Sequence, residues 1–382
     1  MTEKKIAIAT GTRADWGLLY PLVKELSDRG HKPQIIATYA HLFPEMGDTI
    51  QELVEDGFPP TMSVPTRRAP HEAVADAVTG FSKALRFLKP DLIVILGDRL
   101  EMLGVASAAM LEKTPIAHIA GGTVSEGAFD DAIRNSISCM SELHFPETEE
   151  AARKLRGMGA KDENITVAGA LGVFNTTSVE DITLDEIEQF LDFKLGRDYL
   201  LATFHPATIS GKSPIEQMKI WIEGLQLVLN EHPEIRLLIT FPNTDTDATP
   251  LLSLLFGFET ANKSRVKIVS SLGRKRYINA ARHALAVIGN SSSGIVEIPS
   301  LGVPVVDVGN RQKGRLRSAA VSHAELSSGA IARSISETIT PESLEKAKST
   351  PNPYFKENTP SVIAERIIEF INSDSIQNGS YK

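Results

Sequence analysis

The chain alternates short apolar, β-branched segments with longer segments whose apolar residues recur at a helical spacing. In the first half, apolar segments ending in small or polar residues predict buried strands at 5–11, 32–38, 91–98 and 114–122. In the second half, the same pattern predicts strands at 199–206, 235–243, 266–271, 285–293 and 303–309. Helical spacing separates them, as in residues 17–30, which end at Gly30. This alternation is typical of α/β proteins with parallel, doubly wound sheets.

The length of the chain favours two domains over one. Its 382 residues exceed what a single compact core usually holds. An acidic stretch at 179–198 separates the two strand-rich halves. We therefore predict domains at 1–180 and 181–358, followed by a C-terminal helical segment at 359–382. That segment could pack on either half, and we assign it to the N-terminal domain. Ligands of such folds lie at the carboxyl ends of the strands, which predicts a cleft between the halves.

Composition excludes several classes of protein. No apolar run approaches the length of a membrane span, so we expect no membrane partner. The net charge of −8 argues against nucleic acid as the main partner. One cysteine, Cys139, leaves no internal disulfide and fits a cytoplasmic protein. The histidines lack metal-ligand spacing and the first strand lacks a dinucleotide-binding glycine motif, so we predict neither metal nor cofactor.

Two strand ends in the first half combine glycine with charged residues. Gly11 and Arg13 follow the first strand where a helix begins, which favours binding of an anion. The alternative for Arg13 is a surface pair with Asp15. Asp98 and Arg99 follow another buried strand, so Asp98 is a candidate base or, alternatively, a helix cap.

Residues 118–133 contain the carboxylates of Glu126, Asp130 and Asp131 within six positions. They either take part in chemistry or form the solvated start of a helix. The pattern alone does not decide between these two interpretations.

The second half contains a serine-rich strand end at 289–294. Backbone N–H groups and the hydroxyls of Ser291 and Ser292 could hold a pyrophosphate there, with Glu297 in the following helix accepting from ribose hydroxyls. The alternative is an ordinary serine helix cap. His205 ends a neighbouring strand and could exchange protons, although a lone histidine is more often structural. Asn243 lies in a third polar strand-end loop.

These motifs, in this order, resemble the UDP-N-acetylglucosamine 2-epimerases over nearly the whole chain. The likeness rests on Gly-Thr-Arg-Ala-Asp at 11–15, Gly-Asp-Arg-Leu-Glu at 97–101, residues 121–134, Phe-His-Pro at 204–206, and Gly-Asn-Ser-Ser-Ser-Gly at 289–294. The chain is more similar to the hydrolysing branch, which makes precursors of sialic acid-type sugars, because Ala14-Asp15 stands where the other branch has Pro-Glu.

The resemblance implies two Rossmann-like domains facing a cleft, the GT-B arrangement, in a homodimer. It implies elimination of UDP from a UDP-sugar, followed by hydration of the glucal. The implied acid–base residues are Asp98, Asp130 and His205. The implied nucleotide-binding residues are Arg13, Arg99, Asn243, Leu272, Ser291, Ser292, Glu297 and Arg311, while Asp131 and Arg134 resemble a supporting pair.

One stretch departs from the family pattern. Many relatives carry acidic residues where this chain has Ala120 and Thr123, and enzymes for 2,4-diacetamido-trideoxy sugars often have histidine at the first position. Glu126 is the nearest carboxylate that could substitute. The leading hypothesis is a hydrolysing epimerase for UDP-N-acetylglucosamine. The alternatives are the same reaction on a UDP-2,4-diacetamido-2,4,6-trideoxy sugar, a GT-B glycosyltransferase, or a non-catalytic UDP-sugar binder.

Overall fold

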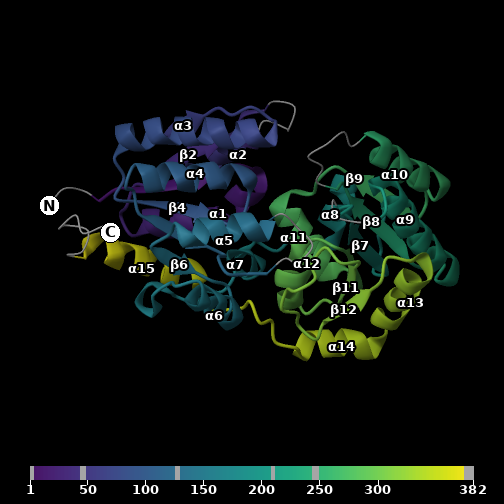
Figure 1. The fold of residues 1–382 in the computed structure, drawn as a ribbon. Coiled ribbons are helices and arrows are strands. Elements are labelled where there is room, and N and C mark those ends of the chain that lie inside the picture. The colour runs from purple at the N-terminus through teal and green to yellow at the C-terminus, as the bar shows by residue number, and fades with distance from the viewer. Residues whose placement is uncertain (1–3, 44–48, 125–129, 208–210, 243–248, 374–382) are drawn as a thin grey trace. The chain divides into compact units, whose positions relative to one another are not determined.

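The computed structural model describes residues 4–43, 49–124, 130–207, 211–242 and 249–373 (Figure 1). These residues form two compact units. The first comprises 4–124, 130–174 and 356–373, and the second comprises the described residues within 175–355. The chain therefore leaves the first unit once and returns to it near its end.

Each unit contains one six-stranded sheet, and all neighbouring strands are parallel. The first sheet has the spatial order β3 (Met62–Val64), β2 (Gln34–Thr38), β1 (Ile6–Thr10), β4 (Leu92–Leu96), β5 (Ile116–Ile119) and β6 (Leu143–Phe145). The second has the order β12 (Val321–Ala324), β11 (Val305–Val308), β10 (Ala286–Gly289), β7 (Tyr199–Thr203), β8 (Arg236–Thr240) and β9 (Val266–Val269). Both sheets follow the Rossmann strand order, which confirms the predicted pair of Rossmann-like folds.

Helices cover both faces of the first sheet (Figure 1). The helices of this unit are α1 (Arg13–Asp28), α2 (Ile50–Glu55), α3 (Pro70–Leu88), α4 (Leu100–Leu111), α5 (Asp130–Cys139), α6 (Glu149–Gly157), α7 (Leu171–Ser178, which runs into the second unit) and α15 (Thr359–Asn372), with the 3₁₀ turns η1 (Tyr39–Leu42) and η3 (Asp162–Asn164). Alternate strand residues pack against α1 and α15 on one face, and against α3, α4 and α5 on the other. Burial on both faces explains the nearly continuous apolar strands.

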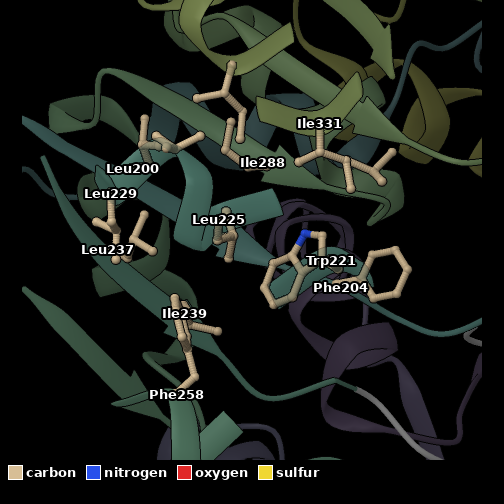
Figure 2. Close-up of a cluster of buried hydrophobic side chains, with 14 of the residues drawn as sticks. Leu200, Phe204, Trp221, Leu225, Leu229, Leu237, Ile239, Phe258, Ile288 and Ile331 are labelled. Atoms are coloured by element: carbon tan, nitrogen blue, oxygen red, sulfur yellow. The ribbon is translucent and has the colours of Figure 1, made fainter. Parts of the chain in front are cut away.

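The second sheet is also covered on both faces. Its helices are α8 (Leu184–Leu191), α9 (Pro214–Glu231), α10 (Thr249–Ala261), α11 (Gly273–His283), α12 (Ser292–Val296), α13 (Ser328–Thr338) and α14 (Pro341–Ser349), with η4 (Ile298–Leu301). One face packs against α9, α10 and α13, and Figure 2 shows this core. There the rings of Phe204 and Trp221 stack with centroids 5.5 Å apart. The stacked pair anchors the backbone immediately before His205.

The chain crosses to the second unit after Phe174, whereas the sequence placed this change at 180. Hydrogen bonds explain the difference. Arg282 Nη2 donates to the carbonyl of Thr176 at 2.9 Å, and Asn279 Nδ2 donates to that of Glu180 at 3.0 Å. Both donors lie on α11, so residues 175–181 are held by the second unit.

Candidate active site

The Rossmann order creates a switch point in each sheet, where neighbouring strands connect in opposite directions. In the first sheet it lies between β1 and β4, and in the second between β7 and β10. Arg13, Asp98 and Arg99 follow the strands of the first switch point, whereas His205, Ser291 and Ser292 follow those of the second. The sequence-predicted residues are thus placed where α/β proteins bind ligands.

Arg13 is the first residue of α1 and its side chain is half exposed. Its Nη1 lies 3.4 Å from Glu52 Oε1 of α2. The alternative of a surface pair with Asp15 is wrong, because Asp15 is turned toward Arg99 and its side chain is only 13% exposed. An exposed guanidinium beside the end of β1 remains able to meet an anion.

Arg99 is held by two carboxylates. Its Nε lies 2.8 Å from Glu101 Oε1 and 3.6 Å from Asp15 Oδ2, and its guanidinium lies over the ring of Tyr39. Burial raises the pKa of Asp15 to about 6, and the charge of Glu101 adds to this, while Arg99 opposes it. A Cβ on Gly11 would approach Glu101 Oε1 to 2.2 Å, so this glycine makes room for the second carboxylate.

Asp98 forms an ion pair with Arg134 of α5, whose side chain is only 4% exposed. The other Nη of Arg134 donates to the carbonyl of Thr123 at 2.6 Å and lies 3.2 Å from Asp131 Oδ1. The predicted Asp131–Arg134 pair is therefore confirmed. Arg134 joins the end of β4, the loop after β5 and helix α5, and so fixes the direction of the Asp98 carboxylate.

Asp130 is the first residue of α5 and is partly exposed. Glu126 lies outside the described residues. Ala120 directly follows β5 in the left-handed conformation, with φ of 62°. Thr123 Oγ1 donates to Glu147 Oε2 at 3.4 Å, which brings a further carboxylate to this edge of the sheet. Glu147 was not predicted from the sequence, because the three-residue strand before it has too few positions to show a pattern.

A buried histidine supports the loop that contains Asp98. His118 Nε2 lies 2.8 Å from the carbonyl oxygen of Gly97, and Nδ1 lies 3.0 Å from Ser138 Oγ. Burial lowers the pKa of His118 to about 4, so the ring is neutral at neutral pH. A neutral ring that donates from Nε2 and accepts at Nδ1 satisfies both contacts.

In the second unit, His205 is bound through its backbone to the side chain of Asn290. Burial lowers the pKa of His205 to about 4, and the nearby charge of Arg311 lowers it further. The imidazole is therefore neutral at neutral pH and equipped to accept a proton. A bound anion beside Arg311 would offset that arginine's charge and raise the pKa.

The helix that follows the serine-rich strand end at 289–294 is shorter than expected from the sequence. Helix α12 has five residues, with Ser291 as its N-cap and Glu297 as its C-cap rather than an internal position. Ser293 Oγ donates to Glu297 Oε2 at 3.1 Å, which orients this carboxylate. Ser291 is half-buried and Ser292 is exposed, so both hydroxyls can reach a ligand.

Two further predicted residues lie near the strand ends of the second sheet. Arg311, after β11, donates from Nη1 to the carbonyl of Asn290 at 3.0 Å. Leu272 is the N-cap residue of α11 and its side chain is buried, so only its backbone is available to a ligand. Asn243 lies outside the described residues.

Over the described ranges, no cluster of three or more His, Cys, Asp or Glu side chains has the arrangement of a metal site. Within the same ranges, no helix combines the length and apolar content that crossing a membrane requires.

The two Rossmann-like units define the class of two-domain, GT-B-like proteins. Residues 24–372 match the family model described as UDP-N-acetylglucosamine 2-epimerase. The chain is 36% identical to the hydrolysing GDP/UDP-N,N'-diacetylbacillosamine 2-epimerase of Campylobacter jejuni, covering 85% of each chain. It is 31% identical to the hydrolysing UDP-N,N'-diacetylbacillosamine 2-epimerase of Legionella pneumophila, covering 88% of this chain and 89% of that one. The chain therefore belongs to the UDP-N-acetylglucosamine 2-epimerase family, in its hydrolysing branch.

A solved structure confirms the fold. The UDP-GlcNAc 2-epimerase of Neisseria meningitidis, determined with bound UDP-GlcNAc, superimposes with a TM-score of 0.80 at 20% identity. The match covers 96% of this chain and all of the other.

Proposed function

We propose that this protein is a hydrolysing UDP-sugar 2-epimerase whose reaction begins with elimination of UDP. The observation that carries the proposal is the placement of the family motifs at the two switch points. Carboxylates and a buried arginine gather at the first, while hydroxyls, an arginine and a histidine gather at the second. Elimination from a nucleotide sugar needs both acid–base groups and groups that stabilise the leaving pyrophosphate.

In the first step a base removes the proton at C2 of the sugar. The C2–H electron pair forms a C1=C2 double bond, and the C1–O bond breaks with its electrons going to UDP. In the second step water adds its hydroxyl to C1, and a proton is delivered to C2 on the opposite face. The products are UDP and a free sugar with the manno configuration. One water is consumed, so the net reaction is also a hydrolysis.

Departure of UDP must help the first step, because the C2 proton is barely acidic. We assign the pyrophosphate to Ser291, Ser292 and Arg311, and further anion contacts to Arg13 and Arg99. Hydroxyl donors and guanidinium groups stabilise the charge that develops on the leaving oxygen. Glu297, oriented by Ser293, is suited to the ribose hydroxyls.

The proton transfers are assigned to Asp98, Asp130 and His205, with Glu126 as a further candidate. Asp98 is paired with the buried Arg134, and His205 is neutral in the absence of an anion. A neutral imidazole can accept a proton, and the pyrophosphate would make its protonated form easier to reach. Asn243 and the backbone of Leu272 are assigned to the nucleotide.

For the sugar, we propose UDP-N,N'-diacetylbacillosamine, a UDP-2,4-diacetamido-2,4,6-trideoxy sugar. The support is the identity of 36% and 31% to relatives named for this substrate. The expectation of UDP-N-acetylglucosamine stays a prediction, supported by the family motifs.

We further propose a cytoplasmic homodimer. Three large apolar side chains, Phe87, Met110 and Leu111, are exposed at the C-terminal ends of α3 and α4. An ion pair of 3.0 Å between Arg86 and Glu112 joins these helix ends. Large apolar side chains exposed at adjoining helix ends favour association. Light scattering should give twice the chain mass, and Phe87→Glu together with Leu111→Glu should reduce it to a monomer; an unchanged mass would exclude this surface.

The test of the reaction is proton NMR of the purified protein in deuterated water with each UDP-sugar separately. We expect UDP and a free manno sugar deuterated at C2. Release of UDP without an acceptor excludes a glycosyltransferase. Binding without UDP release would leave the non-catalytic alternative, and turnover of one sugar over the other identifies the substrate.

A further inference from the structure

The backbone of His205 lies beyond the point where the pairing between β7 and β10 ends. The ladder between β7 and β10 ends with Thr203 opposite Gly289, after which Asn290 N–H donates to the Thr203 carbonyl at a long 3.3 Å. Pro206 follows His205 and has no N–H to donate. The partly buried peptide groups of His205 therefore need other partners.

The side-chain amide of Asn290 supplies both. Its Oδ1 accepts from the His205 N–H at 2.7 Å, and its Nδ2 donates to the His205 carbonyl at 2.8 Å. The amide thus pairs with the His205 backbone as a peptide group of a neighbouring strand would. Asn290 is only 2% exposed, so its amide is largely shielded from water. Among side chains, only an amide offers a donor and an acceptor in this fixed geometry.

The backbone of Asn290 connects the same point to a third loop. Its carbonyl accepts from Arg311 Nη1 at 3.0 Å and from Gln312 Nε2 at 2.9 Å. The loops that follow β7, β10 and β11 are therefore joined at this one residue. Two of these loops contain residues assigned to the pyrophosphate, and the third contains His205.

We propose that Asn290 is a positioning residue that fixes the His205 imidazole relative to the pyrophosphate-binding groups. The inference rests on the proposed function and deepens it. Proton transfer needs donor and acceptor within hydrogen-bond reach, and a displacement of about 1 Å costs on the order of 10²-fold in rate. Loss of the two hydrogen bonds between the Asn290 amide and the His205 backbone moves the imidazole. The serine and arginine contacts to the nucleotide stay in place.

The test compares Asn290→Asp with Asn352→Asp. Aspartate keeps the shape and one acceptor but loses the donor to the His205 carbonyl. Asn352 is a matched control in the same unit, because its side-chain amide also donates to one backbone group and accepts from another. It donates to the Val296 carbonyl at 2.7 Å and accepts from the Tyr354 N–H at 3.0 Å. Both variants should unfold at similar temperatures.

We expect Asn290→Asp to lower kcat by about 10²-fold with KM changed by less than about threefold, and to alter the pH profile of kcat. Asn352→Asp should keep the wild-type kcat and profile. In a His205→Ala background, Asn290→Asp should have almost no further effect, because it acts through that histidine. A wild-type kcat in Asn290→Asp, or an equal loss with and without His205, would overturn the proposal.

Failure of the proposed function is recognised separately, as absence of UDP release by the wild-type protein with either sugar. In that case the positioning of His205 by Asn290 is tested by NMR of isotope-labelled histidine. Asn290→Asp should shift the His205 imidazole signals, and Asn352→Asp should not. Unchanged His205 signals in both variants would overturn the positioning role.

Discussion

Asp15 Oδ2 lies 3.6 Å from the Nε of Arg99, inside the first unit and beside the buried Glu101. Two carboxylates thus share one guanidinium. Burial raises the pKa of Asp15 from 3.8 to about 6, because the single cation does not compensate for the loss of water. The ionised form of Asp15 is therefore held at a cost in stability.

Asp15→Asn should raise the free energy of unfolding at pH 7.5. The folded state binds a proton more tightly than the unfolded state, so stability due to Asp15 falls as the pH rises from about 4 to about 6. Above this range the loss is constant, at about 3 kcal/mol or less. The variant should gain up to that amount at pH 7.5 and nothing below pH 4.

The measurement is urea unfolding of wild type and variant at each pH. Buried His118 and His205, whose pKa values are lowered to about 4, change stability in the opposite direction between about 4 and 6.5. Only the difference between the two proteins therefore reports on Asp15. An equal difference at pH 4 and pH 7.5 would contradict this account.

Asp98→Asn should lower turnover by about 10²-fold or more, with UDP binding largely retained. It should also reduce the free energy of unfolding by about 1 to 3 kcal/mol, because Arg134 is buried and loses one of its two carboxylate partners. Kinetics and denaturant titration measure the two effects. Asp130→Asn is the comparison, and it should lower turnover similarly. Normal turnover in either variant would remove that residue from the assigned chemistry.

Replacing Ser291 and Ser292 together by Ala should weaken UDP binding, measured by calorimetry, by about tenfold. Ser327→Ala is the matched control, because Ser327 also caps a helix of the second unit and accepts from Ala330 N–H at 3.3 Å. It should cost about 1 kcal/mol of stability and leave UDP affinity unchanged. Equal UDP affinity in the wild type, the double variant and Ser327→Ala would show that Ser291 and Ser292 serve only to cap the helix.

Gly289→Ala should reduce the free energy of unfolding by about 3 kcal/mol or more. A Cβ at this position would lie 1.7 Å from the Thr203 carbonyl oxygen, and φ is 146°. The strands β7 and β10 cannot separate without breaking the sheet at its switch point. Gly257→Ala in the exposed middle of α10 meets nothing within 4 Å and should stabilise by about 0.5 to 1 kcal/mol. Thermal unfolding of the two variants should shift in opposite directions.

The predicted strands of both sheets are present, but three strands were missed. These are β3, β6 and β12, which have three, three and four residues and all lie at sheet edges. An edge strand is paired on one side only and can be short, so it carries little periodic signal. The central strands were predictable because burial on both faces requires continuous apolar residues.

Among the site residues, sequence motifs predicted the strand ends and the Asp131–Arg134 pair, but not the other partners. The alternative that Arg13 pairs with Asp15 was wrong, since Asp15 is paired with Arg99 and Arg13 with Glu52. Asn290 had no assigned role, since the sequence does not reveal that its amide faces the backbone of a residue 85 positions earlier. Such contacts depend on strand order, which a single sequence leaves open.

The return of the chain to the first unit has a consequence for synthesis. Ile363, Ile367 and Ile371 of α15 are fully buried against the first sheet, and Thr359 Oγ1 donates to the Ala168 carbonyl at 2.7 Å. The sheet made first by the ribosome therefore lacks part of its core until the final helix has emerged. The described residues of the second unit lie within the single span 175–355, and this unit can complete its core earlier. A chain that ends before Thr359 can therefore fold its second unit, while the first unit still exposes the apolar face that α15 would cover.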